Sequence, residues 1–202
     1  MTTNLLVKTF KKSSGLFWIT LLFVAFTLFS TQPLLGQQVY KIVPKGNSLL
    51  VKGDSNLHEW ETKGDQITGE LSSVIDNGKF KKIDKVSVKI TVNSLKSGKG
   101  VMDSKVYEAL KNDKFPTITY QSDNITLPRT NEIVSIGQFT IAGVSKSKML
   151  TGTYTIGTDG KITIKGSVKL KMTEFGMTLP TAFFGSLKVY DDVEVLYEVS
   201  FK

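Results

Sequence analysis

The stretch KITIKGSVKLKM, residues 161–172, alternates apolar and polar side chains, with one glycine in the apolar series. Alternate side chains of a β-strand point to opposite faces, so this pattern predicts a strand with one buried and one solvated face. The same alternation recurs in KVSVKITV, residues 85–92, and in VEVLYEVSF, residues 193–201. The chain is therefore expected to consist mainly of half-buried strands.

Short turn signals separate these strands. They are DNGK at 76–79, PRTNE at 128–132 and GTDGK at 157–161. Asp159-Gly160 between two alternating runs is typical of a hairpin, because glycine supplies the positive φ that a tight connection needs. With no βαβ rhythm, the sequence predicts about eight to ten antiparallel strands in a sandwich or barrel, enough to close around one ligand.

One segment, residues 102–113, departs from the strand pattern. Its apolar residues with helical spacing are Val106, Ala109 and Leu110. Asp103 or Ser104 is the expected N-cap. Pro116 then restarts an extended chain, because the residue before proline avoids the α region. We expect one short helix, placed as a lid or plug between strands.

The first 36 residues are typical of a secretory signal peptide. Three lysines precede an uncharged apolar run at residues 15–29, which is short for a membrane-spanning helix. We expect cleavage near Gly36 and a periplasmic or secreted protein with one domain, residues 37–202. The alternative is an uncleaved N-terminal anchor, because STQPLLGQQ, residues 30–38, matches a cleavage site weakly.

The composition argues against several classes of protein. The formal net charge is +8, yet Arg129 is the only arginine. Arginine makes the bidentate contacts to bases and phosphates, so nucleic-acid binding is not expected. The lysines leave room for peripheral contact with an anionic membrane. The chain has no cysteine, which excludes disulfides, thiol catalysis and cysteine-ligated metals.

His58, in SNLHEW at residues 55–60, is the only histidine. A Ser-His-Asp arrangement would need a nucleophile motif such as G-x-S-x-G, which is absent, and one histidine alone does not make a metal site. SKSK at 145–148 matches S-x-x-K only formally and is expected in a basic turn. Asp191 and Asp192 are adjacent and would point to opposite faces of a strand. We expect no catalytic residue, no metal and no enzymatic activity, with His58 in the wall or mouth of a barrel.

Large apolar side chains gather near the expected strand ends. Each one taken alone is most simply a core residue. As a group they could line an apolar cavity. The mouth of a β-barrel is a preferred location for such a ligand-binding cavity. The candidate ligand-binding residues are Trp60, Phe115, Tyr120, Phe139, Phe175, Met177, Phe183 and Phe184, with His58 as a polar candidate at the mouth.

The order of several motifs resembles that of the YceI-like family. These motifs are YKIV at 40–43, ALKNDKFPTITYQS at 109–122, GQFTIAGVSK at 137–146, KMTEFGM at 171–177 and DDVEVLYEVSF at 191–201. The resemblance implies an all-β fold, an extended lipocalin-like antiparallel β-barrel with one short helix. It also implies a polyisoprenoid ligand in the interior, such as an isoprenoid quinone or related lipid, with no other cofactor, and it is compatible with a homodimer.

The sequence departs from the family pattern at two places. Many members carry a His-Ser pair after the first strand and an R-D-x-H-L stretch before the lid. Here these places read Asn47-Ser48 and MDSKV, with Met102 and Lys105 in place of the arginine and the histidine. Head-group contacts of those family residues are therefore not carried over.

Two functions of different classes follow from the sequence. The first is an exported, non-enzymatic protein that holds an isoprenoid-like or other long-chain lipid in its barrel, for transport or storage. The second is a structural or interaction protein whose barrel is filled by its own side chains and whose basic outer face binds an anionic partner. A hydrolase or isomerase built around His58 is a third hypothesis.

Overall fold

The computed structural model describes residues 36–182 and 185–202. The expected signal peptide, apart from Gly36, lies outside the described residues, and so do Phe183 and Phe184. In the part of the chain that is described, no helix has the length and apolarity needed to cross a membrane.

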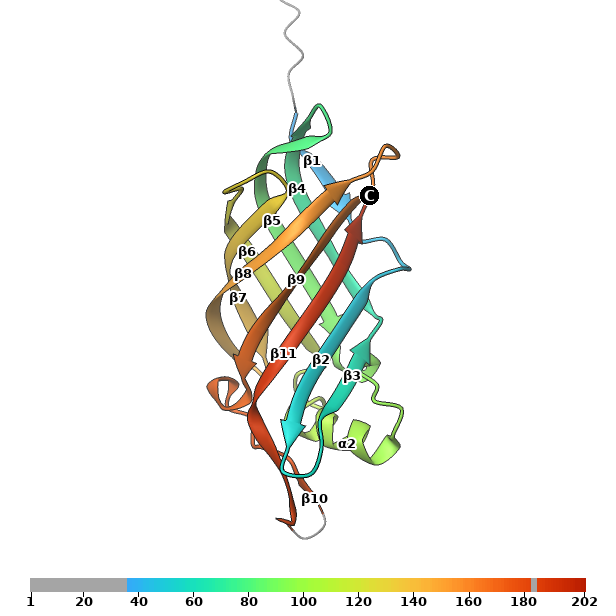
Figure 1. The fold of residues 1–202 in the computed structure, drawn as a ribbon, viewed down its shortest axis with the longest axis vertical. Coiled ribbons are helices and arrows are strands. Elements are labelled where there is room, and N and C mark those ends of the chain that lie inside the picture. The colour runs from blue at the N-terminus through green and yellow to red at the C-terminus, as the bar shows by residue number, and fades with distance from the viewer. Residues whose placement is uncertain (1–35, 183–184) are drawn as a thin grey trace, which may run out of the picture. The chain divides into compact units, whose positions relative to one another are not determined.

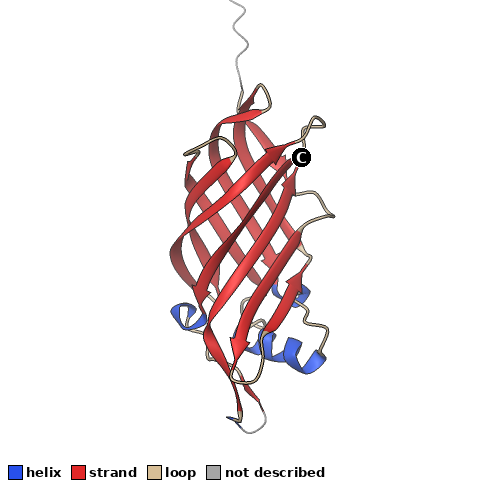
Figure 2. Ribbon diagram, in the orientation of Figure 1, coloured by secondary structure: helices blue, strands red, loops and turns tan. Residues whose placement is uncertain are grey.

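The described strands form one antiparallel sheet that curls into a barrel (Figure 1, Figure 2). In neighbour order the strands are β1 (Gln38–Lys41), β4 (Ile67–Asp76), β5 (Lys79–Thr91), β6 (Thr117–Thr126), β7 (Glu132–Ile141), β8 (Val144–Ile156), β9 (Ile162–Lys171), β11 (Leu187–Phe201), β2 (Ser48–Ser55) and β3 (Trp60–Gly64). A short β10 (Thr181–Ala182) pairs only with β11. The predicted all-β, lipocalin-like antiparallel barrel with one short helix is confirmed for these residues.

The barrel closes because both edge strands of the sheet, β1 and β3, make backbone hydrogen bonds to other segments. At one end, the N–H of Lys41 donates to the carbonyl of Lys202 at 2.9 Å, and the N–H of Lys202 donates back at 2.8 Å. At the other end, Lys63 and Lys96 exchange two backbone hydrogen bonds of 2.8 Å. These bonds join β1 to the end of β11, and β3 to the segment after β5.

The alternation predicted for residues 161–172 is confirmed. Lys165, Lys169 and Lys171 are exposed on the outer face. The apolar series on the inner face is buried; its members are Ile162, Ile164, Val168, Leu170 and Met172. The period of two thus separates the dry interior from the wet exterior of the barrel.

Turns form at the predicted hairpins, with one exception. Gly78 between β4 and β5 has a φ of 71°, and Gly160 between β8 and β9 has a φ of 78°, a region that glycine adopts without steric cost. The expectation that Ser145–Lys148 forms a turn is wrong. The chain already reverses at Ala142 and Gly143, which both have positive φ, so residues 145–148 belong to β8.

The predicted helix is α2 (Gly100–Ala109), but it begins earlier than expected. Its N-cap is Lys99, so the prediction that Asp103 or Ser104 caps the helix is wrong. The reason is that the Asp103 carboxylate has other partners. It accepts hydrogen bonds from the N–H of Ser97 at 2.7 Å and from the Ser97 hydroxyl at 2.6 Å. Asp103 therefore lies in the first turn and holds the preceding loop.

The end of the barrel away from α2, near the C-terminus in Figure 1, is filled by side chains. Leu71, Ile162 and Phe201 are fully buried. The rings of Phe80 and Tyr154 pack with their centroids 4.6 Å apart. Hydrophobic burial in this half stabilises a fold that has no disulfide.

Tyr197 lies on the inner face of β11, with its hydroxyl group over Gly166 of β9. A Cβ atom at Gly166 would lie 2.4 Å from the Tyr197 hydroxyl oxygen, so a side chain there would displace the ring. Burial, together with the nearby Tyr120, raises the pKa of Tyr197 to about 12. The neutral phenol is therefore the form that suits this site.

We expect Tyr197 to weaken the folded state as the pH rises from 10 to 12. A tyrosine in the unfolded chain ionises near 10.0, whereas Tyr197 in the fold stays neutral up to about 12. Ionisation thus favours the unfolded state across this window, and the stability present below it is lost. Thermal unfolding of the wild type and of Tyr197→Phe should show the wild type losing more Tm between these pH values. A difference in Tm that stays constant would contradict the expectation.

Candidate functional site

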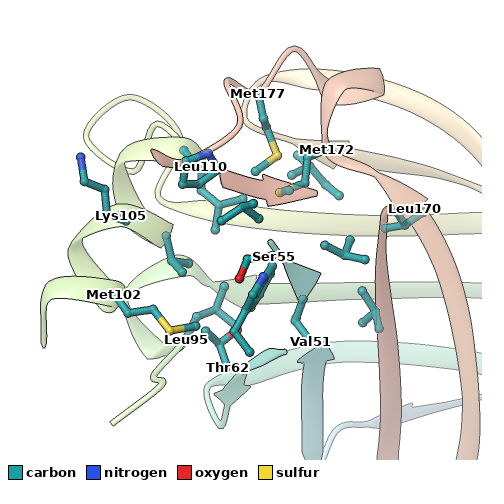
Figure 3. A pocket seen from close by; sticks show the side chains of 18 of the residues that line it. Val51, Ser55, Thr62, Leu95, Met102, Lys105, Leu110, Leu170, Met172 and Met177 are labelled. Atoms are coloured by element: carbon teal, nitrogen blue, oxygen red, sulfur yellow. The ribbon is translucent and has the colours of Figure 1, made fainter. Parts of the chain in front are cut away.

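A cavity of about 380 Å³ lies inside the barrel at the end that α2 covers (Figure 3). Seven strands contribute residues to its lining: β2, β3, β6, β7, β9, β10 and β11. Representative wall residues are Val51 of β2, Thr62 of β3, Ile118 of β6, Ile141 of β7, Leu170 of β9 and Val195 of β11. Apart from the Thr62 hydroxyl, these side chains are hydrocarbon, so the wall offers few partners to a polar ligand.

Two segments close the cavity from outside the barrel. One is α2, and the other is the chain that follows β9, which includes a 3₁₀ turn at Met172–Phe175. Their side chains in the cavity include Met102, Val106, Leu110, Met172, Phe175 and Met177. The ammonium group of Lys111 donates to the carbonyl of Gly176 at 3.0 Å and joins the two segments. Figure 3 shows Leu110 near Met172 and Met177 across the cavity opening.

Polar contacts on the other side of α2 hold the helix in place. The buried Asp103 binds Ser97, and these hydrogen bonds lower the pKa of the Asp103 carboxyl. The Tyr107 hydroxyl donates to the carbonyl of Leu95 at 2.9 Å. The Lys96 ammonium lies 5.0 Å from the centroid of the Tyr107 ring, a cation–π contact. The helix is thus anchored to the segment that follows β5.

His58 lies in the turn before β3 and lines the mouth of the cavity. Its Nδ1 is 2.9 Å from the carbonyl oxygen of Glu59. Ser55 holds the turn, because its hydroxyl donates to the His58 carbonyl at 2.7 Å and accepts from the His58 N–H at 3.1 Å. The imidazole therefore contacts a backbone carbonyl group at the cavity mouth.

Trp60, at the start of β3, lies against β2. A Cβ atom on Gly53 would be 2.2 Å from Cζ2 of the indole, so the glycine leaves the space that the ring occupies. The indole Nε1 donates to the carbonyl of Asp54 at 3.2 Å. Trp60 and His58 together form one side of the mouth.

Charged groups are confined to the rim of the cavity. Lys99, Lys105 and Lys171 line it. The Lys171 ammonium hydrogen-bonds Asp192 at 2.8 Å, which raises the pKa of Lys171, and Lys105 pairs with Glu108 at 2.9 Å. In Figure 3 the Lys105 ammonium extends away from the cavity. An open groove of about 730 Å³, lined by charged residues of both signs, adjoins this rim.

No metal-binding cluster accompanies the cavity in residues 36–182 and 185–202. No three His, Asp or Glu side chains there gather as metal ligands. Asp191 accepts hydrogen bonds from the N–H of Thr173 at 2.8 Å and from its hydroxyl at 2.6 Å, whereas Asp192 pairs with Lys171. The two adjacent carboxylates thus bind separate partners.

The cavity brings together four of the nine predicted ligand-binding residues and adds many that sequence reasoning missed. The predicted residues in its lining are His58, Trp60, Phe175 and Met177. The additional lining is mainly aliphatic and includes Val51, Leu170 and Val195. Alternation had already placed Leu170 and Val195 on a buried face. The prediction favoured aromatic side chains and so passed over them.

Three other predicted residues do not line the cavity. Tyr120 and Phe139 are buried deeper in the barrel, with ring centroids 4.7 Å apart. Phe115 is 38% exposed and lies beside the β7–β8 turn, where a Cβ on Gly143 would be 2.3 Å from its ring. Phe183 and Phe184 are outside the described residues.

The fold and the cavity match a known family. A family model described as the YceI-like domain matches residues 40–201. The chain belongs to the YceI-like family. Met102 and Lys105, which differ from the pattern common in this family, both lie in the cavity lining.

Solved structures share the fold at low sequence identity. BcnA of Burkholderia cenocepacia aligns with a TM-score of 0.65 and 16% identity, over 76% of this chain and 95% of that chain. A polyisoprenoid binding domain from Saccharophagus degradans, implicated in plant cell wall breakdown, aligns with a TM-score of 0.63 and 11% identity, over 81% and 97%. The YceI protein of Campylobacter jejuni aligns with a TM-score of 0.56 and 22% identity, over 69% and 82%. No curated protein matches the chain.

We expect Asp103→Ala to lower the free energy of unfolding by about 1–3 kcal/mol, because it removes the charged acceptor of two hydrogen bonds from the half-buried Ser97. The contribution should be complete at neutral pH and lost as the pH falls below 3.8, because the folded-state pKa is lowered from that value. Chemical denaturation measures both effects. Asp113→Ala, at an exposed site just after the helix, is the control and should change stability by less than about 0.5 kcal/mol. Equal losses in both variants would contradict this role of Asp103.

Proposed function

We propose that the protein binds a long-chain lipid of the isoprenoid type in the barrel cavity, without covalent chemistry. The observation that carries this proposal is a cavity of about 380 Å³, open at its mouth, whose wall is mostly hydrocarbon and whose charged lining residues lie at the rim. Each CH₂ group that leaves water for such a site contributes about 0.8 kcal/mol. A lipid with a polar head group fits this arrangement, because its head would contact the lysines at the rim and its apolar tail would lie in the cavity.

The solved relatives and the contacts of His58 favour binding over catalysis. One structural neighbour is described as a polyisoprenoid binding domain. The His58 ring contacts the Glu59 carbonyl and no carboxylate that would orient a catalytic base. A lipid or quinone in the cavity would be the ligand, and no further cofactor is needed for this function.

The cavity and the outer face both weigh against the alternative of a filled barrel with a basic binding face. Adjacent strands β9, β11, β2 and β3 place Lys169, Glu194, Lys52 and Glu61 side by side on the outer face. Opposite charges alternate across these strands, so neighbouring charges compensate each other there. Such a face has little net attraction for an anionic partner.

The signal-peptide pattern suggests that binding takes place outside the cytoplasm. We propose a periplasmic or secreted protein that transports or stores its lipid. A cavity that holds a nearly insoluble chain would allow that chain to pass through water between membranes. Association into a homodimer stays a prediction.

We expect lipid to copurify with the full-length chain expressed in a bacterial host. Organic extraction and mass spectrometry should find a stoichiometric isoprenoid or other long-chain lipid. Ala109→Trp should reduce the bound lipid at least tenfold, because Ala109 of α2 lines the cavity and the indole would occupy it. Ser104→Trp places the same side chain at an exposed position of α2 and should leave the lipid content unchanged. Lipid-free wild-type protein that also takes up no added quinone would contradict the proposal.

Exposed apolar side chains around the rim support contact with a membrane surface. Val101 is 79% exposed and lines the opening, Leu57 is 61% exposed beside His58, and Tyr190 is 51% exposed beside the lining residue Val189. Apolar side chains can enter the boundary between head groups and acyl chains while nearby lysines attract anionic lipids. We propose that the rim is the part of the protein that meets the bilayer.

We expect Leu57→Ser combined with Val101→Ser to slow the uptake of a fluorescent isoprenoid from anionic vesicles several-fold. The measurement is the rate of transfer from vesicles to protein, with the final amount bound as a check on the cavity. Val39→Ser is the control, because Val39 is 59% exposed on β1 at the opposite end of the barrel (Figure 1). Rates that fall equally in the double variant and in the control would refute docking through the rim.

A further inference from the structure

The cavity ends at a layer of side chains across the middle of the barrel. On four of the wall strands, β2, β6, β7 and β11, the next inward-facing residue lies two positions farther from α2. These residues are Leu49 after Val51, Tyr120 after Ile118, Phe139 after Ile141 and Tyr197 after Val195, and none of the four lines the cavity. We call Leu49, Tyr120, Phe139 and Tyr197 the tyrosine layer.

The hydroxyl groups of the two tyrosines in this layer have partners on the neighbouring strands β7 and β8. The hydroxyl of Tyr120 lies 2.7 Å from the Ser135 hydroxyl, and that of Tyr197 is 3.4 Å from the Thr151 carbonyl oxygen, a long contact. Tyr120 packs closely over Gly137 of β7, where a Cβ atom would be 2.6 Å from its hydroxyl oxygen.

The barrel beyond the tyrosine layer has little room for a ligand. Leu71, Ile162 and Phe201 are fully buried there, and Tyr154 packs on Phe80 directly beyond the layer. A chain that entered from the α2 end would therefore stop at Tyr120 and Tyr197. Extending it further would require the displacement of close-packed side chains, which is costly.

We propose that the tyrosine layer sets how much of the isoprenoid chain enters the barrel, so that the part held in the cavity ends at this layer. The inference rests on the proposed function. From Val189 at the mouth to Val195, the last cavity residue of β11 before the layer, six residues span about 20 Å along the strand, or about 15 Å along the barrel axis. An isoprene unit adds four carbon–carbon bonds, or about 5 Å of extended chain, so the cavity takes about three units.

The test is a series of isoprenoid alcohols that differ by one isoprene unit. Affinity for the full-length chain is measured by displacement of bound anilinonaphthalene sulfonate. Each unit that finds room should tighten binding at least about tenfold, and the gain should stop after about three units. Affinity that keeps rising through much longer alcohols overturns the length limit and leaves lipid binding intact. No binding at any length overturns the proposed function itself.

Variants on both sides of the layer locate the limit. Tyr197→Ala removes a ring from the layer. In this variant, affinity should keep rising for about one isoprene unit more than in the wild type. Val195→Phe adds a ring just in front of the layer. In this variant, affinity should stop rising at a shorter alcohol than in the wild type. Tyr154→Ala opens a comparable space behind the layer and is the matched control, for which the limit should stay as in the wild type.

Several outcomes would overturn the proposal. If Tyr197→Ala folds and its length limit equals that of the wild type, the tyrosine layer does not stop the chain. A shift in Tyr154→Ala as large as that in Tyr197→Ala points to general loosening of the core. If Tyr197→Ala does not fold, the test rests on Val195→Phe. A length limit in Val195→Phe equal to that of the wild type would show that the bound chain does not reach the layer.

Discussion

The two-sided pairing of β11 is the constraint on which the rest of the structure depends. This strand pairs with β9 along one edge and with β2 along the other, and its end bonds to the end of β1. The same strand passes through every zone of the interior: Val193 and Val195 line the cavity, Tyr197 belongs to the tyrosine layer, and Phe201 fills the far end. A register shift lies between Val189 and Val193, but Val189 still pairs with Ser55 of β2, and the first part of β11 also pairs with β10.

Alternation predicted the faces of the strands well, because the side-chain period of a strand is a local property of the backbone. It could not give depth along the barrel. Tyr120 and Ile118 share a face of β6, yet Ile118 lines the cavity and Tyr120 is buried beneath it. Depth depends on the register between strands, which pairs Tyr120 with Phe139 and is fixed by contacts far apart in sequence. The predicted ligand-binding set therefore mixed residues of two different depths.

The helix illustrates the same limit for local rules. Asp103 is a good N-cap residue by type, but Ser97 offers it two hydrogen-bond donors, and the helix starts at Gly100. That arrangement anchors the helix on one side, while Lys111 joins its other end to Gly176. The segments that cover the cavity are thus held by a few polar contacts rather than by a sheet, so their opening requires far fewer broken hydrogen bonds than opening the barrel.

The division of the barrel into a filled half and a hollow half follows from the energetics of packing. An interior space of about 380 Å³ forgoes the dispersion contacts and burial that side chains would have made there. With no disulfide to compensate, stability must come from the half that contains Leu71, Ile162 and Phe201. Lengthening the cavity at the expense of these residues would remove the contacts that keep the barrel closed. The size of the hollow half is therefore limited by the stability of the fold, and a bound hydrocarbon chain restores part of the missing packing.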